Sequence, residues 1–529
     1  MQPNNPTNKE RYDLFKKALR EVKREEDFET IIKSNSPAPD ILSIGKNNSL
    51  KGIKIAVIGG GCAGLASAYE LRKVGANVTL FEANKSRIGG RLYTYYFRDD
   101  LYGEFGGMRF PVSHETVWHY INTFKLNTFP MNQHNENDVL NVRDVSVFGL
   151  NNSKDIKEKI YPMFDLTNEE KNNNLSDLVL RVYNDPLLKL DVKTRKYINT
   201  VSNNYPKIIK ALDSINLRQA MEKANLSQAA IDLITSSQGI DRGLLYCSYI
   251  ETLREMYSLN FVNVYSIENG AMRLPIAFND SFSKDNFSGK VNVKMGHRIN
   301  KIIYNNKKIT IGFNNEIDNL NGSEEFDYVI CTIPFTSLRL VELKPNFSNV
   351  KMQAIRELNY LNSTKVIFLC NQSFWEKNNN PGGSIYSDLV ITSTWFPSQK
   401  SRDNFSVITA SYTLDEDAIR LGNISERHRI NLIKRQIEKC YGFKEGYLDN
   451  IIVDYSSLTW NHPDNQLGAF PMVYPEQTIL FSYQITTPEY NNQLYFAGDH
   501  MSTYHGWVQG ALQTGMMAAN DLLKNHLKK

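Results

Sequence analysis

The feature that most constrains this chain of 529 residues is a glycine-rich turn between an apolar run, residues 55–58, and a small-residue amphipathic segment, residues 65–74. The turn has the spacing GxGxxG, with glycines at Gly59, Gly61 and Gly64. This order predicts a strand, a tight turn and a helix. Gly59 allows the turn, Gly61 lets the backbone approach a pyrophosphate, and Gly64 lets the helix pack closely on the strand.

A second apolar run, residues 78–81, follows the helix and ends at Glu82, roughly 20 residues after the glycines. An acidic residue at this place can accept hydrogen bonds from a ribose 2′-OH. An ordinary glycine turn is the alternative, but it requires neither the second strand nor Glu82. The complete pattern therefore predicts an adenine-dinucleotide site on a Rossmann-like α/β domain.

Two basic residues and two glycines stand just beyond the second strand, at Arg87, Gly89, Gly90 and Arg91. Taken alone, they indicate a basic surface loop. The segment nevertheless resembles the GGR signature of the flavin amine oxidase superfamily, whose members bind FAD and wrap this segment around its pyrophosphate and ribityl chain. Simple NAD dehydrogenases that resemble the first half do not carry it, so the resemblance implies FAD.

Three further segments resemble this family and follow in the expected order: EFGGMRFP at 104–111, LNSTKVIFLCNQSFWE at 361–376, and YFAGDHMSTYHGWVQGALQTGMMAANDLL at 495–523. The first looks like a motif of L-amino-acid oxidases and tryptophan 2-monooxygenases, in which the arginine, here Arg109, pairs with the substrate α-carboxylate. A guanidinium suits that role because it binds a carboxylate bidentately and keeps its charge. The alternative is a structural ion pair with Glu104.

The other two segments imply groups beside the flavin ring. Lys365 matches a family lysine that holds a water against flavin N5, and a solvated residue at a strand edge is the alternative. Asp499 matches a residue that bonds a ribityl hydroxyl, and the carbonyl of Gly506 would lie near the substrate amine. The helix at 507–523 would direct its N-terminus at the flavin pyrimidine, which also fits a plain amphipathic C-terminal helix.

The walls of the substrate pocket follow from the same resemblance. Phe470 and Trp507 would sandwich the substrate side chain, with Trp460 nearby, although each could equally be a core aromatic. Trp395 stands where venom-type L-amino-acid oxidases have a tyrosine pair, so carboxylate recognition would rest more on Arg109. Glu255 falls at the place of a proposed base histidine. It is either a solvated helical glutamate or a pocket residue that favours a cationic side chain such as lysine or arginine.

The resemblance implies cofactor contacts throughout the flavin segments. These positions are Gly59, Gly61, Ala63, Gly64, Glu82, Ala83, Gly89, Gly90, Arg91, Gly107, Met108, Arg109, Ile299, Trp460, Gly498, Asp499, Gly506, Trp507 and Val508. Monoamine oxidases attach their flavin through a cysteine in the C-terminal segment, and this chain has no cysteine after Cys440. We therefore predict non-covalent FAD.

Composition excludes several other classes of function. The chain has 61 basic and 57 acidic residues, a net charge of +4 that favours neither nucleic acid nor a membrane surface. No run approaches the roughly 20 apolar residues of a spanning helix, and the N-terminus lacks the apolar region of a secretory signal. We therefore expect a cytoplasmic protein. Five cysteines without CxxC spacing predict neither disulfides nor a metal site.

The changes of pattern along the chain predict six segments in an α/β fold with a helical insertion and a second, sheet-based domain. The expected segments are an N-terminal helical extension at 1–50, the FAD-binding domain at 51–112, 261–345 and 485–529, a helical domain at 113–260, and a substrate-binding sheet domain at 346–484. A glycine turn at 266–275 is assigned to the substrate domain. The stretch at 130–175 is rich in Asn and Asp and has no clear pattern of helix or strand.

These observations predict an FAD-dependent L-amino-acid oxidase with a p-hydroxybenzoate-hydroxylase-like body. Hydride transfer from Cα to flavin N5 would give an imino acid, which hydrolyses to a 2-oxo acid and ammonia, while dioxygen is reduced to hydrogen peroxide. An L-amino acid and dioxygen are the expected partners, and we expect a homodimer. The alternatives are a decarboxylating amino-acid 2-monooxygenase that yields an amide, a simple amine or polyamine oxidase, against which Arg109 argues, and a non-catalytic FAD-binding subunit.

Overall fold

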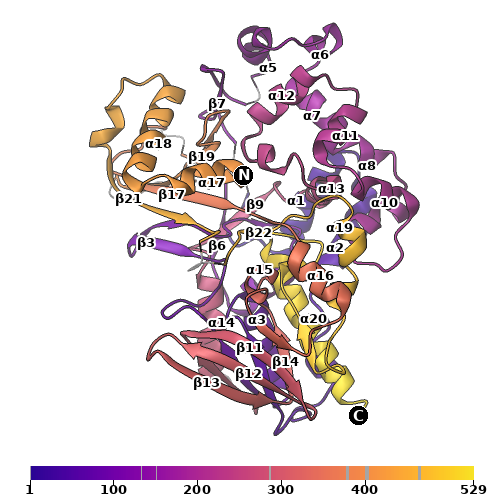
Figure 1. Cartoon of the computed structure of the whole chain (residues 1–529). Helices are drawn as coiled ribbons and strands as arrows, with labels where there is room; N and C mark the ends of the chain where they lie inside the picture. Colours follow the sequence, from indigo (N-terminus) through magenta and orange to yellow (C-terminus); the bar gives the residue numbers. More distant parts are fainter. Residues whose placement is uncertain are drawn as a thin grey trace.

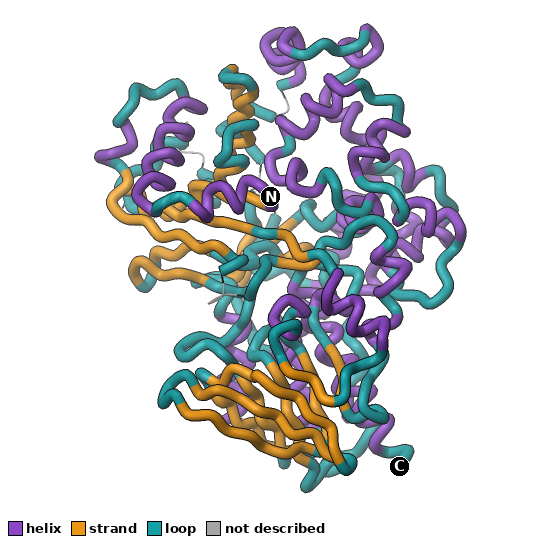
Figure 2. The backbone as a smooth tube through the Cα atoms, viewed as in Figure 1, coloured by secondary structure: helices purple, strands orange, loops and turns teal. Residues whose placement is uncertain are grey.

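A computed structural model describes residues 2–132, 134–150, 152–284, 287–376, 381–398, 404–462 and 466–529, with the side chains of residues 240 and 241 left aside. Figure 1 shows three parts: a lower part that contains α3 and α20, a sheet with α18 at the upper left, and a group of helices at the upper right. Figure 2 shows strands concentrated in the first two parts and helices in the third.

The lower part is built on a five-stranded parallel sheet with the order β10-β2-β1-β14-β23. Its strands are β10 (Lys290–Lys294), β2 (Asn77–Phe81), β1 (Lys54–Ile58), β14 (Tyr328–Cys331) and β23 (Leu494–Phe496). β1 runs between β2 and β14, with Ile55 opposite both Val78 and Tyr328. Three segments far apart in sequence therefore supply one sheet.

Strand β1 is apolar at successive positions because both of its faces are buried. Ile55 and Val57 pack in the core shared with α3 (Cys62–Lys73), whereas Ala56 and Ile58 pack in a second core. That second core lies against a four-stranded sheet, which consists of β13 (Leu320–Phe326), β12 (Lys308–Asn315), β11 (His297–Asn305) and β15 (Glu342–Lys344). The glycine turn at the end of β1 is thus held between two packed layers.

Helix α20 (Val508–His526) packs on α3, and small residues allow the close approach. The hydroxyl of Ser67 donates to the carbonyl of Gly515 at 3.0 Å. A Cβ added at Gly515 would lie 2.4 Å from the carbonyl oxygen of Ala63. Helix α14 (Arg273–Lys284) also contacts α3, so the predicted strand–turn–helix is enclosed by later parts of the chain.

The upper left part contains a seven-stranded sheet with the order β21-β17-β20-β19-β18-β7-β8. Its strands are β21 (Ile452–Thr459), β17 (Ser363–Cys370), β20 (Ser406–Leu414), β19 (Ser393–Trp395), β18 (Ser384–Ser387), β7 (Val139–Val142) and β8 (Val145–Phe148). Helices α17 (Asp415–Asn423) and α18 (Glu426–Tyr441) follow β20. Smaller pairings join β3 (Thr94–Arg98) to β4 (Leu101–Glu104) and β16 (Tyr360–Leu361) to β22 (Phe470–Pro471).

Helices form most, but not all, of the segment 113–260. They are α4 (Glu115–Thr123), α5 (Ser153–Asp155), α6 (Asn168–Asn172), α7 (Leu175–Tyr183), α8 (Asp185–Leu188), α9 (Val192–Arg195), α10 (Lys207–Asp213), α11 (Leu217–Lys223), α12 (Gln228–Ser237) and α13 (Tyr249–Tyr257). The segment is mostly helical, and the two strands β7 and β8, whose positions the sequence pattern did not indicate, complete the seven-stranded sheet. Val139 pairs with Ile385, a partner too distant in sequence for a local pattern to reveal. A further sheet joins β5 (Phe110–Pro111), β9 (Val264–Ile267) and β6 (Thr128–Pro130).

The N-terminal extension forms two helices, α1 (Asn8–Glu21) and α2 (Phe28–Asn35), which dock on the protein's own body. Thr7 and Glu10 form a capping box at the start of α1. Arg11 then pairs with Glu115 of α4 at 2.6 Å, and both side chains are nearly buried. The remaining short helices are α15 (Phe335–Leu338), α16 (Asn349–Glu357) and α19 (Gln477–Phe481). In the described part of the chain, no helix has the length and apolar character needed to cross a membrane.

Candidate active site

A cavity of about 620 Å³ lies where the parallel sheet, the seven-stranded sheet and the helical segment meet. Ligands of open parallel sheets bind at the carboxyl ends of the strands, and the residues that follow β1, β2 and β14 line this cavity. The predicted site residues line it as well, with the exception of Gly64. The structure therefore brings together in one space residues that are spread from position 59 to position 508.

The glycine turn at the end of β1 has the geometry that its sequence predicts. Gly59 has φ +104°, and a Cβ added at Gly64 would lie 2.0 Å from the Gly59 carbonyl oxygen. A Cβ added at Gly61 would meet nothing closer than the Cα of Gly90, at 3.9 Å. Gly64 is thus required by the chain itself, whereas Gly61 leaves open space at the N-terminus of α3, where a pyrophosphate would be stabilised.

Glu82 is buried one residue beyond β2 and is held by backbone donors. Its two carboxylate oxygens accept hydrogen bonds from the amides of Gly60, at 2.9 Å, and Asn84, at 2.7 Å. Burial raises the pKa of Glu82, while these two amides and Arg87 act against that shift. The carboxylate is fixed at the end of the cavity that the dinucleotide motif forms, where it retains lone pairs for a ribose hydroxyl.

The GGR segment is tied to the C-terminal flavin segment by an ion pair. Arg91 binds Asp499 bidentately, at 2.6 and 3.0 Å, and donates to the Ala469 carbonyl at 3.1 Å. Burial raises the pKa of Asp499, but Arg91 and His500 outweigh burial and hold it well below its usual value. The Gly506 amide donates to the same carboxylate at 3.2 Å. Asp499 therefore fixes both the segment after β2 and the turn before α20.

Lys365 lies on β17, an interior strand of the seven-stranded sheet, and is 3% exposed. Its Nζ donates to the carbonyls of Gly106, at 2.9 Å, and Glu104, at 3.3 Å, and lies 4.4 Å from the ring centroid of Tyr412. Burial, followed by the charge of Arg109, lowers the pKa of Lys365 to about 7, while Glu104 opposes the shift. The interpretation of Lys365 as a solvated edge residue is therefore wrong.

Arg109 is 9% exposed, and its Cζ lies 4.4 Å from the ring centroid of Trp395 and 5.8 Å from that of Phe261. Among the residues described by the structure, no carboxylate pairs with it, and its Nε is buried without a hydrogen-bond partner. Glu104 instead accepts from the Thr94 hydroxyl and the Ala271 amide. The alternative ion pair between Arg109 and Glu104 therefore does not form.

The residues predicted as pocket walls line the cavity. Glu255 of α13 accepts from the indole Nε1 of Trp507, at 2.8 and 3.1 Å, and lines the cavity, so it is not simply a solvated helical residue. Trp460 donates its Nε1 to the Phe105 carbonyl at 3.0 Å, which anchors the segment before Arg109. Phe470 packs against Gly506, where an added Cβ would lie 3.1 Å from its ring.

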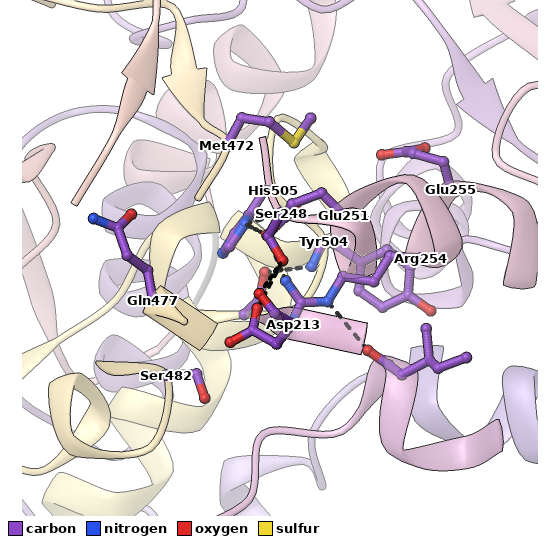
Figure 3. Close-up of polar contacts among 12 residues, drawn as sticks. Asp213, Ser248, Glu251, Arg254, Glu255, Met472, Gln477, Ser482, Tyr504 and His505 are labelled. Atoms are coloured by element: carbon purple, nitrogen blue, oxygen red, sulfur yellow. Dashed lines mark hydrogen bonds and ion pairs between the residues drawn. The ribbon is translucent and has the colours of Figure 1, made fainter. Parts of the chain in front are cut away.

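Several cavity residues were missed by the sequence prediction. Phe261, Tyr386 and Tyr412 line the cavity near Arg109 and Lys365. The turn that contains His505 was expected to line the site, but its contact with α13 was missed: Figure 3 shows Glu251 of α13 in contact with both Arg254 and His505. The spacing of Glu251 and Arg254 on one helix signals their pairing. Nothing in the local sequence signals the partner 254 residues further along.

Fold and cavity together define a dinucleotide-binding α/β protein, and comparison with known proteins refines this class. The family model of flavin containing amine oxidoreductases matches residues 62–523, so the chain belongs to this family. A Bacillus subtilis (strain 168) protein, provisionally named the L-amino-acid oxidase YobN, is 29% identical over 479 residues, which are 88% of this chain and 94% of that protein.

Two further similarities extend this result. The L-amino-acid oxidase of Sistrurus catenatus edwardsii is 26% identical over 509 residues, which cover 95% of this chain and 92% of that protein. A solved structure of putrescine oxidase bound to putrescine has a TM-score of 0.69 at 17% identity and covers 89% of this chain and 98% of the other. The structural similarity establishes the fold of an FAD-dependent amine oxidase.

The cofactor of the family is FAD, and the residues of this cavity fit it. The open space at Gly61, the N-terminus of α3 and the buried Glu82 match a pyrophosphate and a ribose. Asp499 and the turn before α20 line the same cavity, as do Lys365 and Arg109. Of the described cysteines, Cys62 alone lines the cavity, and burial raises its pKa to about 12.

Proposed function

We propose that this flavoprotein oxidises an L-amino acid to a 2-oxo acid and ammonia and reduces dioxygen to hydrogen peroxide. The observation that carries this proposal is Arg109, a buried guanidinium that has no acidic partner among the described residues and lies beside Trp395 in the cavity. Burying a cation without a counter-ion is unfavourable, so an anionic ligand completes the site. An amino acid supplies that anion, whereas a simple amine does not.

Residues of the chain bind the substrate, orient it and position a water molecule. Arg109 binds the substrate carboxylate, and Phe470, Trp460 and Trp507 orient the side chain. The Gly506 carbonyl accepts a hydrogen bond from the substrate amine. When bound, FAD accepts a hydride from the substrate and passes the electrons to dioxygen. Lys365, which the Gly106 and Glu104 carbonyls hold in place, positions the water that hydrolyses the imino acid.

Glu255 supports a narrower proposal about the side chain of the substrate. Its carboxylate lines the same cavity as Arg109 and accepts a hydrogen bond from the Trp507 indole. A carboxylate in the same cavity as the carboxylate-binding arginine favours a substrate with a second, cationic end. We therefore expect L-lysine and L-arginine to react faster than L-leucine.

An anaerobic reduction screen tests the proposal. The FAD-loaded protein is mixed with each of the twenty L-amino acids, with the D-enantiomers and with the matching decarboxylated amines, and bleaching of the flavin absorbance is followed. One or more L-amino acids should bleach the flavin, and their amines should not. An amine that reacts as fast as its parent amino acid would replace this proposal with an amine oxidase, and a spectrum that no compound bleaches would indicate a non-catalytic FAD-binding subunit.

Product analysis separates the oxidase from the rival monooxygenase. Under air, the proposal requires 2-oxo acid, ammonia and hydrogen peroxide in equal amounts. An amide with one carbon fewer than the amino acid, together with carbon dioxide, would assign the chain to the decarboxylating 2-monooxygenases. Non-covalent FAD and a homodimer stay predictions; gel filtration measures the second directly.

A further inference from the structure

A buried cluster of three charged or titratable side chains borders the cavity at the turn before α20. His505 Nδ1 lies 3.0 and 3.1 Å from the two carboxylate oxygens of Glu251, and Glu251 also pairs with Arg254 at 2.6 Å. All three side chains are less than a tenth exposed. Figure 3 shows the cluster on one side of α13, with Glu255, one turn further along the helix, apart from it.

The contacts of Glu251 determine which nitrogen of His505 carries the proton. A carboxylate accepts hydrogen bonds, so Nδ1 is the protonated nitrogen and Nε2 presents a lone pair. Nε2 has no hydrogen-bond partner in the described part of the chain, and His505 lines the cavity. The two ring nitrogens of His500 are buried without a hydrogen-bond partner, whereas Nε2 of His505 is not among the buried atoms that lack one. An available base therefore faces the cavity.

Three other titratable groups that line the cavity are already held by hydrogen bonds. Lys365 donates to two carbonyls, Glu255 accepts from Trp507, and Asp499 is held by Arg91. His505 differs because it directly precedes Gly506, whose carbonyl lies beside the substrate amine in the proposed function. It is thus a base adjacent in sequence to the carbonyl that the proposed function assigns to the amine.

We propose that His505 is the proton acceptor of the site and takes one proton from the substrate ammonium. The N–H bond of the ammonium breaks, its electron pair stays on nitrogen, and the proton forms a new bond to Nε2. The neutral amine that remains is the form from which a hydride can leave the adjacent carbon. Glu251 stabilises the imidazolium that results, and Arg254 holds Glu251 in place. This inference rests on the proposed function. It adds the role of proton acceptor, which neither Lys365 nor Arg109 has there.

Charges on each element packed against His505 bear on its pH dependence. Glu251 and Arg254 face it from α13, and Asp499 and His500 precede it in its own segment. Burial raises the pKa of Glu251, but His505 and Arg254 outweigh burial and lower it overall. Glu251 therefore remains ionised at neutral pH, and its carboxylate accepts the hydrogen bond from His505 Nδ1.

The test is the pH profile of anaerobic flavin reduction in three proteins: wild type, His505→Ala and Glu251→Gln. His505→Ala should reduce the rate at pH 7 on the order of 10²-fold and remove the histidine ionisation from the profile. Added imidazole should restore part of the rate. Glu251→Gln removes the anion, so the acidic limb should move to lower pH and the plateau rate should fall.

His428→Ala, which removes an exposed histidine on α18, is the matched control and should keep the wild-type profile. Flavin content and far-UV circular dichroism establish that each variant is folded; His505→Gln replaces His505→Ala if the latter loses FAD. A wild-type pH profile in a folded His505 variant overturns this inference and leaves the proposed function intact. If no amino acid reduces the flavin of the wild type, the proposed function is overturned instead. If only amines are oxidised, the His505 test can still be made, because amines are also protonated in solution.

Discussion

The guanidinium of Arg109 lies over the indole of Trp395, with Cζ 4.4 Å from the ring centroid. An aromatic face attracts a cation but does not satisfy its N–H donors, since the ring offers no lone pair in the guanidinium plane. The stacked arrangement therefore holds the cation in place and leaves its edge for a ligand. A carboxylate that binds bidentately fits this edge.

Arg109→Leu should remove most of the activity toward L-amino acids. Truncating one partner of a buried, hydrogen-bonded charge pair costs roughly 2–5 kcal/mol, which corresponds to about 30-fold to several-thousand-fold in affinity. Steady-state kinetics should show this loss in kcat/KM, with the flavin spectrum unchanged. Arg427→Leu, which removes an exposed arginine on α18, is the control and should behave as wild type. An equal loss for amino acids and their decarboxylated amines would contradict the carboxylate role.

Two glycines of the same turn should respond differently to alanine. Gly64→Ala places a Cβ 2.0 Å from the Gly59 carbonyl oxygen, so the apoprotein itself should lose roughly 1–3 kcal/mol of stability or more. Gly61→Ala meets no atom of the chain closer than 3.9 Å, so the apoprotein should unfold at the wild-type temperature but bind FAD weakly. Thermal unfolding of the apoprotein and FAD titration measure the two effects. Wild-type FAD affinity in Gly61→Ala would show that the pyrophosphate does not pass this glycine.

Lys365 should make the stability of the fold depend on pH. Burial is the main cause that lowers its pKa from 10.5 to about 7 in the folded chain. Between these pH values the unfolded chain holds a proton that the folded chain has released, so the contribution of this group to stability rises with pH across the window. The melting temperature of wild type relative to Lys365→Met should therefore increase from pH 7 to pH 10. A difference that is constant over this range would mean that Lys365 has an ordinary pKa in the folded protein.

The same variant has a kinetic consequence. If Lys365 positions the hydrolytic water, Lys365→Met should retain FAD and bind substrate, and should slow flavin reoxidation or imine hydrolysis more than it affects binding. Stopped-flow measurement of both half-reactions tests this. Half-reactions that match wild type would leave Lys365 with a structural role, in which it donates to the Gly106 and Glu104 carbonyls.

Acid precipitation should release the flavin into the supernatant. Cys62, the described cysteine that lines the cavity, lies in the first turn of α3, and burial raises its pKa to about 12, so it is a poor nucleophile. Yellow colour that remains in the washed pellet would indicate a covalent bond. Peptide mapping of that pellet would then identify the attached residue.

The parts of the fold that could be predicted are those whose signals are local. The strand at 55–58, its glycines and Glu82 form one short unit, and the structure has them as β1, the turn and the residue after β2. Strands β7 and β8 could not be predicted, because they lie in an Asn-rich stretch and gain their stability from pairing with β18. Their residues need a distant partner before an extended conformation is favoured.

The same distinction holds for the site. Arg109, Trp395 and Lys365 were predicted by resemblance, but Tyr412, the aromatic partner of Lys365, comes from another strand of the seven-stranded sheet and was not. The cluster of Glu251 and His505 joins residues 254 positions apart and has no sequence signal of its own. Pairings of this kind depend on tertiary packing, and the sequence pattern indicates at most one of the two partners.

Arg91 and Asp499 form their ion pair across 408 positions of the chain, and α20 covers α3 across a similar span. This connection has a consequence for the order of events during synthesis. A nascent chain that has emerged as far as the glycine turn lacks β14, β23 and α20. The turn that would bind the pyrophosphate is then exposed, because the strands and the helix that pack around it are not yet present. Because domains fold as units, we expect FAD to be taken up only after the ribosome has added residues 494–523, which makes flavin loading the last step in maturation of the polypeptide.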